Sequence, residues 1–218
     1  MIFYDYWRSS SAWRVRIALH LKGIPFERRA VNLLAQEQYE PEFLALNPLG
    51  QVPALIIPGQ GGGPSRVLAQ SIAILGYLEE RFPEPALLPP PASWERARAR
   101  QLAEMINSGI QPFQNSALQP RLREAGVADP TAIARAYNAV GLAALEQVAR
   151  ETAGSFLIGD APTIADLYLI PQLYSARRFG VDLAACPTLL RVEAAAASLP
   201  AFQAARPEAQ TDAVPPNA

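Results

Sequence analysis

The chain has 218 residues, half of them apolar, and a formal net charge of −1. This length allows one large or two small domains with a real core, and the near-zero charge argues against nucleic acid or an anionic membrane as the main partner. A single cysteine, Cys186, excludes an internal disulfide, and with only one histidine we expect no structural zinc or other metal site.

The N-terminal sequence does not resemble that of a secreted protein. Met1–Asp5 lacks the basic region and the long apolar run of a signal peptide. No stretch of the sequence approaches the roughly 20 apolar residues that a membrane-spanning helix requires. We therefore expect a soluble, cytoplasmic protein.

The first 25 residues predict a strand that leads into a helix. Met1–Tyr6 is a short apolar and aromatic run, which is typical of a strand. Apolar residues then recur at helical spacing until Gly23-Ile24-Pro25 ends the pattern. The residues at this spacing are Val15, Ala18, Leu19 and Leu21.

Three serines, Ser9, Ser10 and Ser11, follow Arg8 where the strand gives way to the helix. A helix N-terminus presents unpaired N–H groups and a partial positive charge. A serine there can cap the helix by accepting a hydrogen bond, or it can donate one to a bound anion. Capping is the favoured interpretation for any one serine. Three hydroxyls beside arginines exceed what a cap needs, and the surplus indicates an anion or thiolate site.

The next elements complete a compact α/β unit in the order β-α-β-α-β-β-α. Pro53 must begin its strand because proline cannot donate to the ladder, and the Val52–Pro53 bond is a candidate for the cis form. The glycine-rich segment Pro58–Ser65 is expected to be a surface loop. The predicted strands are Phe26–Leu33, Pro53–Ile57 and Arg66–Leu68, and the predicted helices are Tyr39–Leu46 and Gln70–Glu79, with Ser71 near an N-cap.

After the proline-rich joint Phe82–Pro91, the pattern is helical throughout. Thr163 and Asp166 resemble a capping box in which Asp166 is buried and structural. The segment from Pro207 is polar and is expected to fray. The predicted helices are Trp94 to about Arg123 with a break near Gly109–Pro112, Thr131–Ala153, a third that opens at Thr163, and a fourth that opens at Cys186-Pro187. In the second of these helices we assign the apolar side to Ile133, Tyr137, Val140, Leu145 and Val148.

These patterns predict an α/β domain over residues 1–82, a linker over 83–93 and an all-α domain over 94–218.

The serine-rich stretch from Arg8 to Leu19 resembles the N-terminal signature of zeta-class glutathione transferases, Arg-Ser-Ser-Cys-x-x-Arg-x-Arg-Ile-Ala-Leu. Ser11 takes the place of the cysteine in that signature. Further motifs of the family follow in the same order along nearly the whole chain: Asn47-Pro48-x-Gly50-Gln51-Val52-Pro53, Gln70-Ser71-Ile72-Ala73-Ile74, Ile110–Asn115, Gly159–Asp166 and Ser175–Asp182. The chain departs from the family in a longer glycine-rich loop, Gly59–Pro64.

The resemblance implies a thioredoxin-like N-terminal domain, a C-terminal helical-bundle domain and glutathione as cofactor. In the family, the backbone beside the cis-proline pairs with the cysteinyl part of glutathione, and a helix N-terminus holds the γ-glutamyl carboxylate. Carried over to this sequence, the implied glutathione-binding residues are Ser9, Ser10, Ser11, Gln38, Val52, Pro53, Gln70, Ser71, Gln111 and Asn115.

The resemblance also implies cis–trans isomerisation of a maleyl keto acid, with maleylacetoacetate as the first choice of substrate. Such a substrate is a dianion, and arginines pair bidentately with carboxylates. The implied clamp is Arg8 with Arg178, and Ser9 is the first choice as hydrogen-bond donor to the thiolate, with Ser10 and Ser11 as alternatives. Because glutathione supplies the sulfur, the serine at position 11 is compatible with this reaction.

Three alternatives stay open at this point. Maleylpyruvate is the rival substrate, since the serine at position 11 weakens the assignment to maleylacetoacetate. A transferase that conjugates glutathione to small haloacids is the second alternative, and a non-catalytic binding protein of the same fold is the third. A homodimer is expected from the family alone.

Overall fold

The computed structural model describes residues 1–59, 61 and 63–214. These residues form two compact units. The first unit contains Met1–Ala86 together with the described residues from Leu199 onward, and the second contains Leu87–Ser198. The C-terminal segment, which the sequence analysis assigned to the helical domain, therefore packs with the N-terminal residues.

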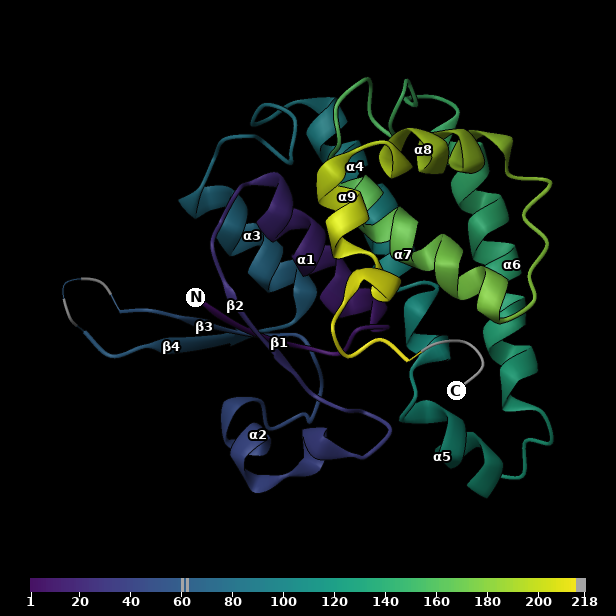
Figure 1. Cartoon of the computed structure of the whole chain (residues 1–218). Coiled ribbons are helices and arrows are strands. Elements are labelled where there is room, and N and C mark those ends of the chain that lie inside the picture. The colour runs from purple at the N-terminus through teal and green to yellow at the C-terminus, as the bar shows by residue number, and fades with distance from the viewer. Residues whose placement is uncertain (60, 62, 215–218) are drawn as a thin grey trace. The chain divides into compact units, whose positions relative to one another are not determined.

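A four-stranded sheet forms the centre of the first unit, with the strand order β2-β1-β3-β4. Strand β1 is parallel to β2 and antiparallel to β3, and β3 is antiparallel to β4. Helices α1 and α3 lie on one face of the sheet and α2 lies on the other (Figure 1). The bounds are β1 (Ile2–Asp5), α1 (Ser10–Leu21), β2 (Glu27–Ala30), the 3-10 helix η1 (Glu37–Tyr39), α2 (Pro41–Leu46), β3 (Ala54–Ile57), β4 (Arg66–Ala69) and α3 (Ser71–Arg81). This succession confirms the predicted β-α-β-α-β-β-α order.

The turn before β3 also follows the prediction. The Val52–Pro53 peptide bond is cis, and Pro53 directly precedes the first residue of the strand. Residues 60 and 62 of the predicted loop Pro58–Ser65 lie outside the described residues, and the flanks of the loop join β3 to β4.

Lys22, the only lysine of the sequence, connects the end of α1 to the end of α3 and the chain that follows it. Its buried ammonium donates to Glu79 Oε2 at 2.8 Å. It also donates to the carbonyl oxygens of Phe82 at 2.6 Å and Pro85 at 2.8 Å. These three acceptors fix the point at which the chain leaves the first unit.

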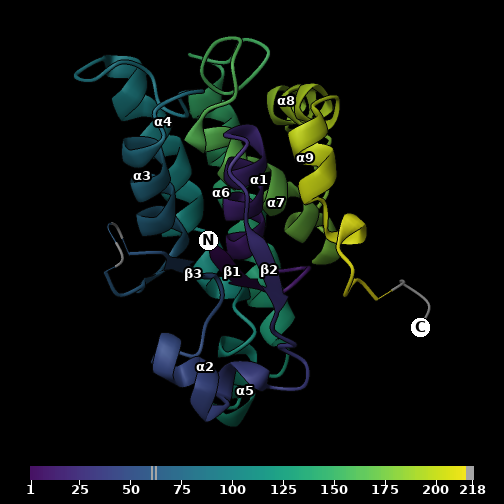
Figure 2. The same ribbon diagram turned by 60° about the vertical axis from the view of Figure 1, so that its left-hand side comes forward.

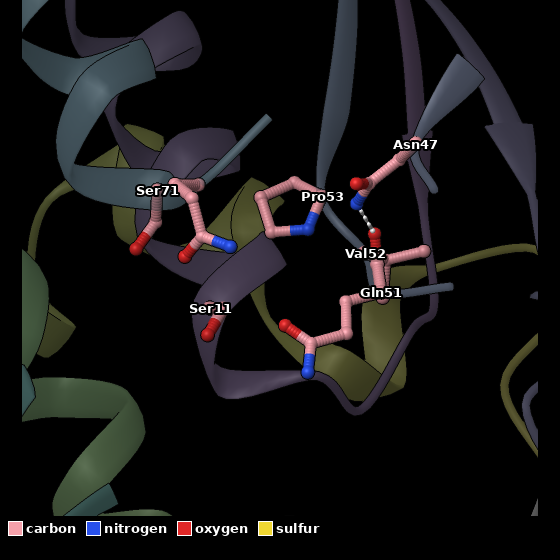
Figure 3. Close-up of a pocket in the computed structure, with 7 residues that line it drawn as sticks. Ser11, Asn47, Gln51, Val52, Pro53 and Ser71 are labelled. Atoms are coloured by element: carbon pink, nitrogen blue, oxygen red, sulfur yellow. Dashed lines mark hydrogen bonds between the residues drawn. The ribbon is translucent and has the colours of Figure 1, made fainter. Parts of the chain in front are cut away.

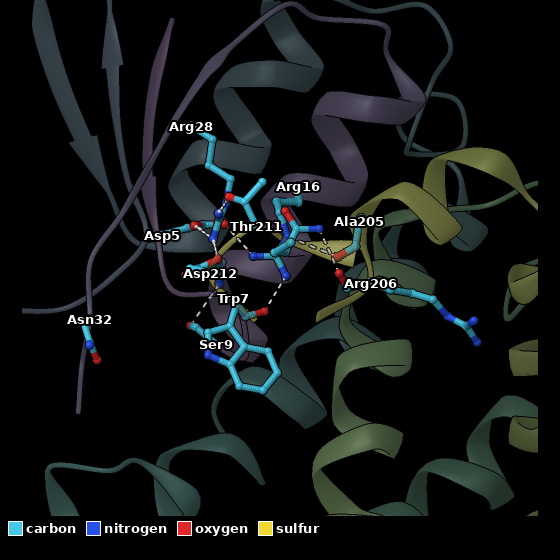
Figure 4. Close-up of polar contacts among 12 residues, drawn as sticks. Asp5, Trp7, Ser9, Arg16, Arg28, Asn32, Ala205, Arg206, Thr211 and Asp212 are labelled. Carbon is cyan, nitrogen blue, oxygen red and sulfur yellow. Dashed lines mark hydrogen bonds and ion pairs between the residues drawn. The ribbon is translucent and has the colours of Figure 1, made fainter. Parts of the chain in front are cut away.

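A cluster of buried and half-buried charges connects β1, α1, β2 and the C-terminal segment (Figure 4). Asp5 and Arg16 are fully buried and lie 2.5 Å apart, and the other carboxylate oxygen of Asp5 lies 2.6 Å from Arg28. Arg28 also pairs with Asp212 at 2.6 Å. The Arg16 guanidinium donates further bonds to the carbonyl oxygens of Trp7 at 2.8 Å and Ala205 at 3.1 Å.

The expectation of a frayed end from Pro207 is therefore wrong for the described residues. The segment forms α9 (Pro200–Ala205) and the 3-10 helix η4 (Pro207–Ala209), and Pro207 itself is buried. The reason is electrostatic, because Asp212 supplies a second carboxylate to Arg28. Residues 215–218 lie outside the described part of the chain.

The second unit is helical, with α7 packed against α4, α6 and α8. Figure 2 shows α5 near the end of α6 that lies away from α8. The bounds are α4 (Trp94–Asn107), the 3-10 helix η3 (Gln111–Gln114), α5 (Leu118–Glu124), α6 (Pro130–Ala149), α7 (Ile164–Arg178) and α8 (Pro187–Ala197). The long helix predicted from Trp94 is thus interrupted near Gly109–Pro112, as expected. Within the described residues, the helices include none with both the length and the apolar character needed to cross a membrane.

The predicted capping box is present at the start of α7, which packs against α4, α6 and α8. Fully buried Asp166 accepts hydrogen bonds from the Thr163 N–H at 2.7 Å, the Thr163 hydroxyl at 3.0 Å and the Leu157 N–H at 2.8 Å. Asp166 therefore has the structural role that the sequence predicts.

The predicted apolar side of α6 is wrong in part. Tyr137 is 43% exposed and Val140 is 73% exposed, although Leu145 is buried as expected. Asn138 and Glu146 take buried positions instead, because each has hydrogen-bond partners there. Glu146 accepts from the backbone N–H groups of Thr188 and Leu189 at the start of α8. The buried face comprises Pro130, Ala134, Asn138, Leu142, Leu145, Glu146 and Ala149.

Removal of the Asp5 carboxylate should destabilise the first unit strongly. In Asp5→Ala, both Arg16 and Arg28 lose their shared partner, and an uncompensated buried charge costs about 3–5 kcal/mol. We expect a loss of that order in the free energy of unfolding, measured by urea denaturation with circular dichroism. Arg29→Ala is the matched control, because Arg29 pairs with Glu27 on the surface. A loss for Asp5→Ala no larger than that of the control would contradict this account.

Candidate functional site

A small hollow lies in the first unit where α1, the turn before β3 and the start of α3 meet (Figure 3). The residues that line it are up to 60 positions apart in the sequence. The lining residues are Ser11, Asn47, Gln51, Val52, Pro53, Gln70 and Ser71. Five of them, Ser11, Val52, Pro53, Gln70 and Ser71, are among the glutathione-binding residues that the sequence analysis selected.

The serines at the start of α1 have different positions. Ser9 is the N-cap, and its side chain accepts a hydrogen bond from the Ala12 N–H at 3.3 Å. Ser10 is the first residue of α1. Ser11, one residue further on, lines the hollow, and Figure 3 shows the Gln51 side chain extending toward it. The geometry therefore favours Ser11 over Ser9 as the hydroxyl that faces a ligand.

The turn before β3 is fixed by Asn47. Its side-chain amide donates to the Gln51 carbonyl at 2.7 Å, and its Oδ1 accepts from the Leu49 N–H at 3.3 Å. Gly50 has a φ of +60°, and a side chain there would collide with the Tyr39 ring. The turn accordingly needs glycine at this position, and it leads into Val52, which lines the hollow.

The start of α3 provides the opposite wall. Gln70 precedes the helix with a φ of +69°, a conformation that costs a non-glycine residue free energy and that is common at functional sites. Within the part of the chain that the structure describes, the Gln70 side chain makes no capping hydrogen bond to the first turn of α3. The N–H groups of the first turn and the dipole of α3 thus favour an anion beside Ser71.

Arg14 is a residue of this region to which the sequence patterns assign no role. Its side chain is fully buried, and its Nη1 donates to Ser71 Oγ at 3.2 Å. The available signal was its spacing, because Arg14 follows Ser11 by three positions and so lies on the same side of α1. A charged residue on the inner side of a helix needs a polar partner, and Ser71 is such a partner.

Two further predicted site residues, Gln38 and Arg8, belong to the first unit and lie near the lining residues in the sequence or in space. Gln38 is buried in η1, and its carbonyl oxygen lies close to Gly50. Arg8 is half-buried, with its guanidinium 5.2 Å from the centre of the Trp7 ring.

The remaining selected residues belong to the second unit. Gln111 is half-buried at the start of η3, and Asn115 is exposed just after it, where its Oδ1 accepts from the Ala117 N–H at 2.9 Å. Arg178 is exposed at the last position of α7.

Three buried or half-buried amides hold η3 in place. Gln172 donates to Gln114 Oε1 at 3.0 Å and to Asn138 Oδ1 at 2.5 Å, and Asn138 donates to Gln114 Oε1 at 3.1 Å. This cluster joins η3 to α6 and α7, so it fixes the backbone that carries Gln111 and Asn115. Sequence reasoning could not find it, because Asn138 and Gln172 carry no pattern that distinguishes them from surface amides.

The chain's own thiol is remote from this chemistry. Cys186 is the only cysteine, it is buried in the second unit, and burial raises the pKa of its thiol. A thiolate is the reactive form, so a buried thiol with a raised pKa is a poor nucleophile. Sulfur chemistry at the hollow therefore requires a thiol that a ligand brings.

Comparisons with known proteins agree with this geometry. A model of the glutathione S-transferase N-terminal domain matches residues 8–81. The chain is 44% identical over 216 residues to maleylacetoacetate isomerase from Pseudomonas aeruginosa, covering 97% of this chain and 98% of that protein.

Two solved structures are similar over nearly the whole chain. Maleylacetoacetate isomerase from Anaeromyxobacter dehalogenans is 56% identical with a TM-score of 0.89, covering 98% of this chain and 97% of that one. It has been solved with glutathione in its active site and also with dicarboxyethyl glutathione and citrate. A bacterial zeta-class maleylpyruvate isomerase is 42% identical with a TM-score of 0.91, covering 98% of this chain and 100% of that one.

Proposed function

Since the chain belongs to the zeta-class glutathione transferase family, we propose that it is a glutathione-dependent cis–trans isomerase of maleyl keto acids. Maleylacetoacetate is the first candidate substrate and fumarylacetoacetate the product. The observation that carries the proposal is the hollow itself, in which a serine at the start of α1, the turn at Pro53 and the start of α3 converge. A relative 56% identical to this chain binds glutathione in its active site.

The residues of the hollow fit the parts of glutathione. The γ-glutamyl carboxylate is an anion, and the start of α3 with the Ser71 hydroxyl offers it N–H and O–H donors. The Val52 backbone, held by the turn before β3, can pair with the cysteinyl part. Ser11 is then the hydroxyl on the α1 side of the hollow that can donate to the sulfur.

Bound glutathione would supply a thiolate that adds reversibly to the maleyl double bond and leaves after the bond has rotated. A free thiol has a pKa near 8.5, and a hydroxyl donor with positive helix-end potential favours the thiolate near pH 7. Ser11 supplies the donor and α1 supplies the potential. Arg8 and Arg178 would bind the two carboxylates of the substrate. Their positive charge would also stabilise the negative charge that develops on the conjugated carbonyl during the addition.

Maleylpyruvate is the second candidate substrate, and the observation that favours it is Ser11. The family signature has cysteine at this position, and an isomerase of the same scaffold that is similar to this chain acts on maleylpyruvate by its name. The reaction and the residue roles are the same for both substrates.

The proposal also covers the oligomeric state, the cellular location and the pathway. A homodimer in the cytoplasm, acting in the breakdown of aromatic amino acids, is the expectation that the family resemblance supports. Sedimentation of the purified protein would test the dimer.

An ultraviolet assay of the two substrates, each with and without glutathione, tests the proposed reaction. We expect isomerisation of at least one substrate that depends on glutathione, and the ratio of the two kcat/KM values identifies the preferred one. Normal glutathione binding without turnover of either substrate would contradict the isomerase proposal. Activity on small haloacids would then indicate a conjugating transferase, and its absence a binding protein.

Replacement of Ser11 should lower turnover more than binding. Ser11→Ala removes a donor to a charged sulfur, and such a bond is worth a factor of about 10 or more in rate. We expect kcat to fall by that factor, with a higher pH needed for full activity because the thiol pKa rises. Ser9→Ala and Ser10→Ala are the matched comparisons, and a larger loss of kcat in either would move the role to that serine.

Replacement of Arg178 should weaken substrate binding. In Arg178→Ala the clamp loses one guanidinium, and we expect KM for the maleyl acid to rise by a factor of about 10 or more. Arg177→Ala is the matched control, because the neighbouring Arg177 pairs with Glu193 at 2.5 Å. Unchanged kinetics of Arg178→Ala would exclude Arg178 from the clamp.

A further inference from the structure

Arg14 is one of the largest fully buried side chains among the described residues, and it contacts Ser71, which lines the hollow. Its guanidinium reaches from α1 to the first residue of α3 and donates to Ser71 Oγ at 3.2 Å. Ser71 is itself only 5% exposed and lines the hollow. A permanent positive charge is therefore in contact with a hydroxyl that a ligand would touch.

The direction of this hydrogen bond determines what the Ser71 hydroxyl can do. A serine hydroxyl has one proton to donate and two lone pairs that accept. Arginine has N–H donors and no acceptor, so Ser71 Oγ must accept from Arg14. The Ser71 proton then has to point away from the guanidinium, and Ser71 is one of the residues that line the hollow (Figure 3).

We propose that Arg14 is a positioning residue that makes Ser71 a hydrogen-bond donor toward the hollow and thereby selects a carboxylate over a neutral amide at the start of α3. This inference rests on the proposed function, in which that carboxylate is the one on the γ-glutamyl residue of glutathione. Arg14 contacts Ser71 and acts through it.

The surroundings strengthen the selection. Arg14 is removed from water, and interactions between charges are stronger in such an environment than in solvent. Its charge adds to the positive end of the α3 dipole beside the same hydroxyl. A carboxylate benefits from both, whereas a carboxamide carries no charge and has an NH2 group, which cannot accept a hydrogen bond, in place of one oxygen.

Calorimetric binding of two peptides tests the proposal. The probes are glutathione and an analogue in which the α-carboxylate of the γ-glutamyl residue is a carboxamide. Wild-type protein should prefer glutathione by a factor of about 100, since a charge-assisted hydrogen bond and the helix dipole both distinguish the two. In Arg14→Met, glutathione affinity should fall by a factor of about 10 or more, while the analogue changes less than about threefold.

A double-mutant cycle separates action through Ser71 from a general effect on the fold. Ser71→Ala should lose selectivity by a similar factor, and Arg14→Met combined with Ser71→Ala should lose little more than Ser71→Ala alone. Losses that add, or an equal loss for both peptides in Arg14→Met, would overturn the inference. Arg29→Met is the control, because it removes an exposed arginine that contacts Glu27 and Tyr4 in the same unit.

A second variant covers the case in which Arg14→Met folds poorly. Arg14→Lys keeps the charge but shortens the reach, so selectivity should fall partly, by a factor of about 3 to 10. Unchanged selectivity in a folded Arg14→Lys would also overturn the inference. Wild-type protein that does not bind glutathione at all would overturn the proposed function as well, whereas wild-type selectivity with unaffected Arg14 variants would overturn this inference alone.

Discussion

The buried pair of Asp5 and Arg16 is the interaction on which most of the first unit depends. Asp5 ends the central strand β1, and Arg16 lies in the middle of α1, so their contact fixes the helix over the sheet. The same guanidinium holds the Trp7 carbonyl, which belongs to the turn that leads into the serines. The positions of Ser9 and Ser11 therefore depend on a charge pair whose members are not among the residues that line the hollow.

Two buried arginines anchor α1 on opposite sides. Residues two positions apart on a helix point about 200° apart, so Arg14 and Arg16 cannot share a partner. Arg16 faces the sheet and the C-terminal segment, and Arg14 faces the start of α3. One arginine stabilises the position of the helix, and the other affects the chemistry of the hollow. A sequence motif with two arginines thus has two separate physical functions.

Much of this arrangement could be predicted from the sequence where a local signal determines the outcome. Proline before β3, the Thr163–Asp166 capping box and the break after α4 each depend on residues close together in the chain. The same holds for Ser11 and Ser71, whose positions at helix starts follow from periodicity. The hollow itself was expected through the family resemblance, because no local rule brings the turn at Pro53 to the two helices.

The failures have a common cause in pairings over long sequence distances. The segment from Pro207 looks polar and unstructured, yet Asp212 finds Arg28 more than 180 residues earlier. Asn138 and Glu146 look like surface residues of α6, yet each is buried because its partners come from other helices. Arg14 received no role for the same reason, since Ser71 is 57 positions away. Hydrophobic periodicity cannot identify a buried polar residue whose partner is distant in the sequence.

The engagement of Lys22 has a consequence for the durability of the protein. Maleyl compounds are electrophiles that alkylate amines and thiols. The ammonium of the only lysine is buried among three oxygen acceptors, and the only thiol is buried in the second unit. The side chains most open to alkylation are therefore shielded in the folded state. Under the proposed function, which brings such reagents to the hollow, this composition makes the protein a poor target for them elsewhere.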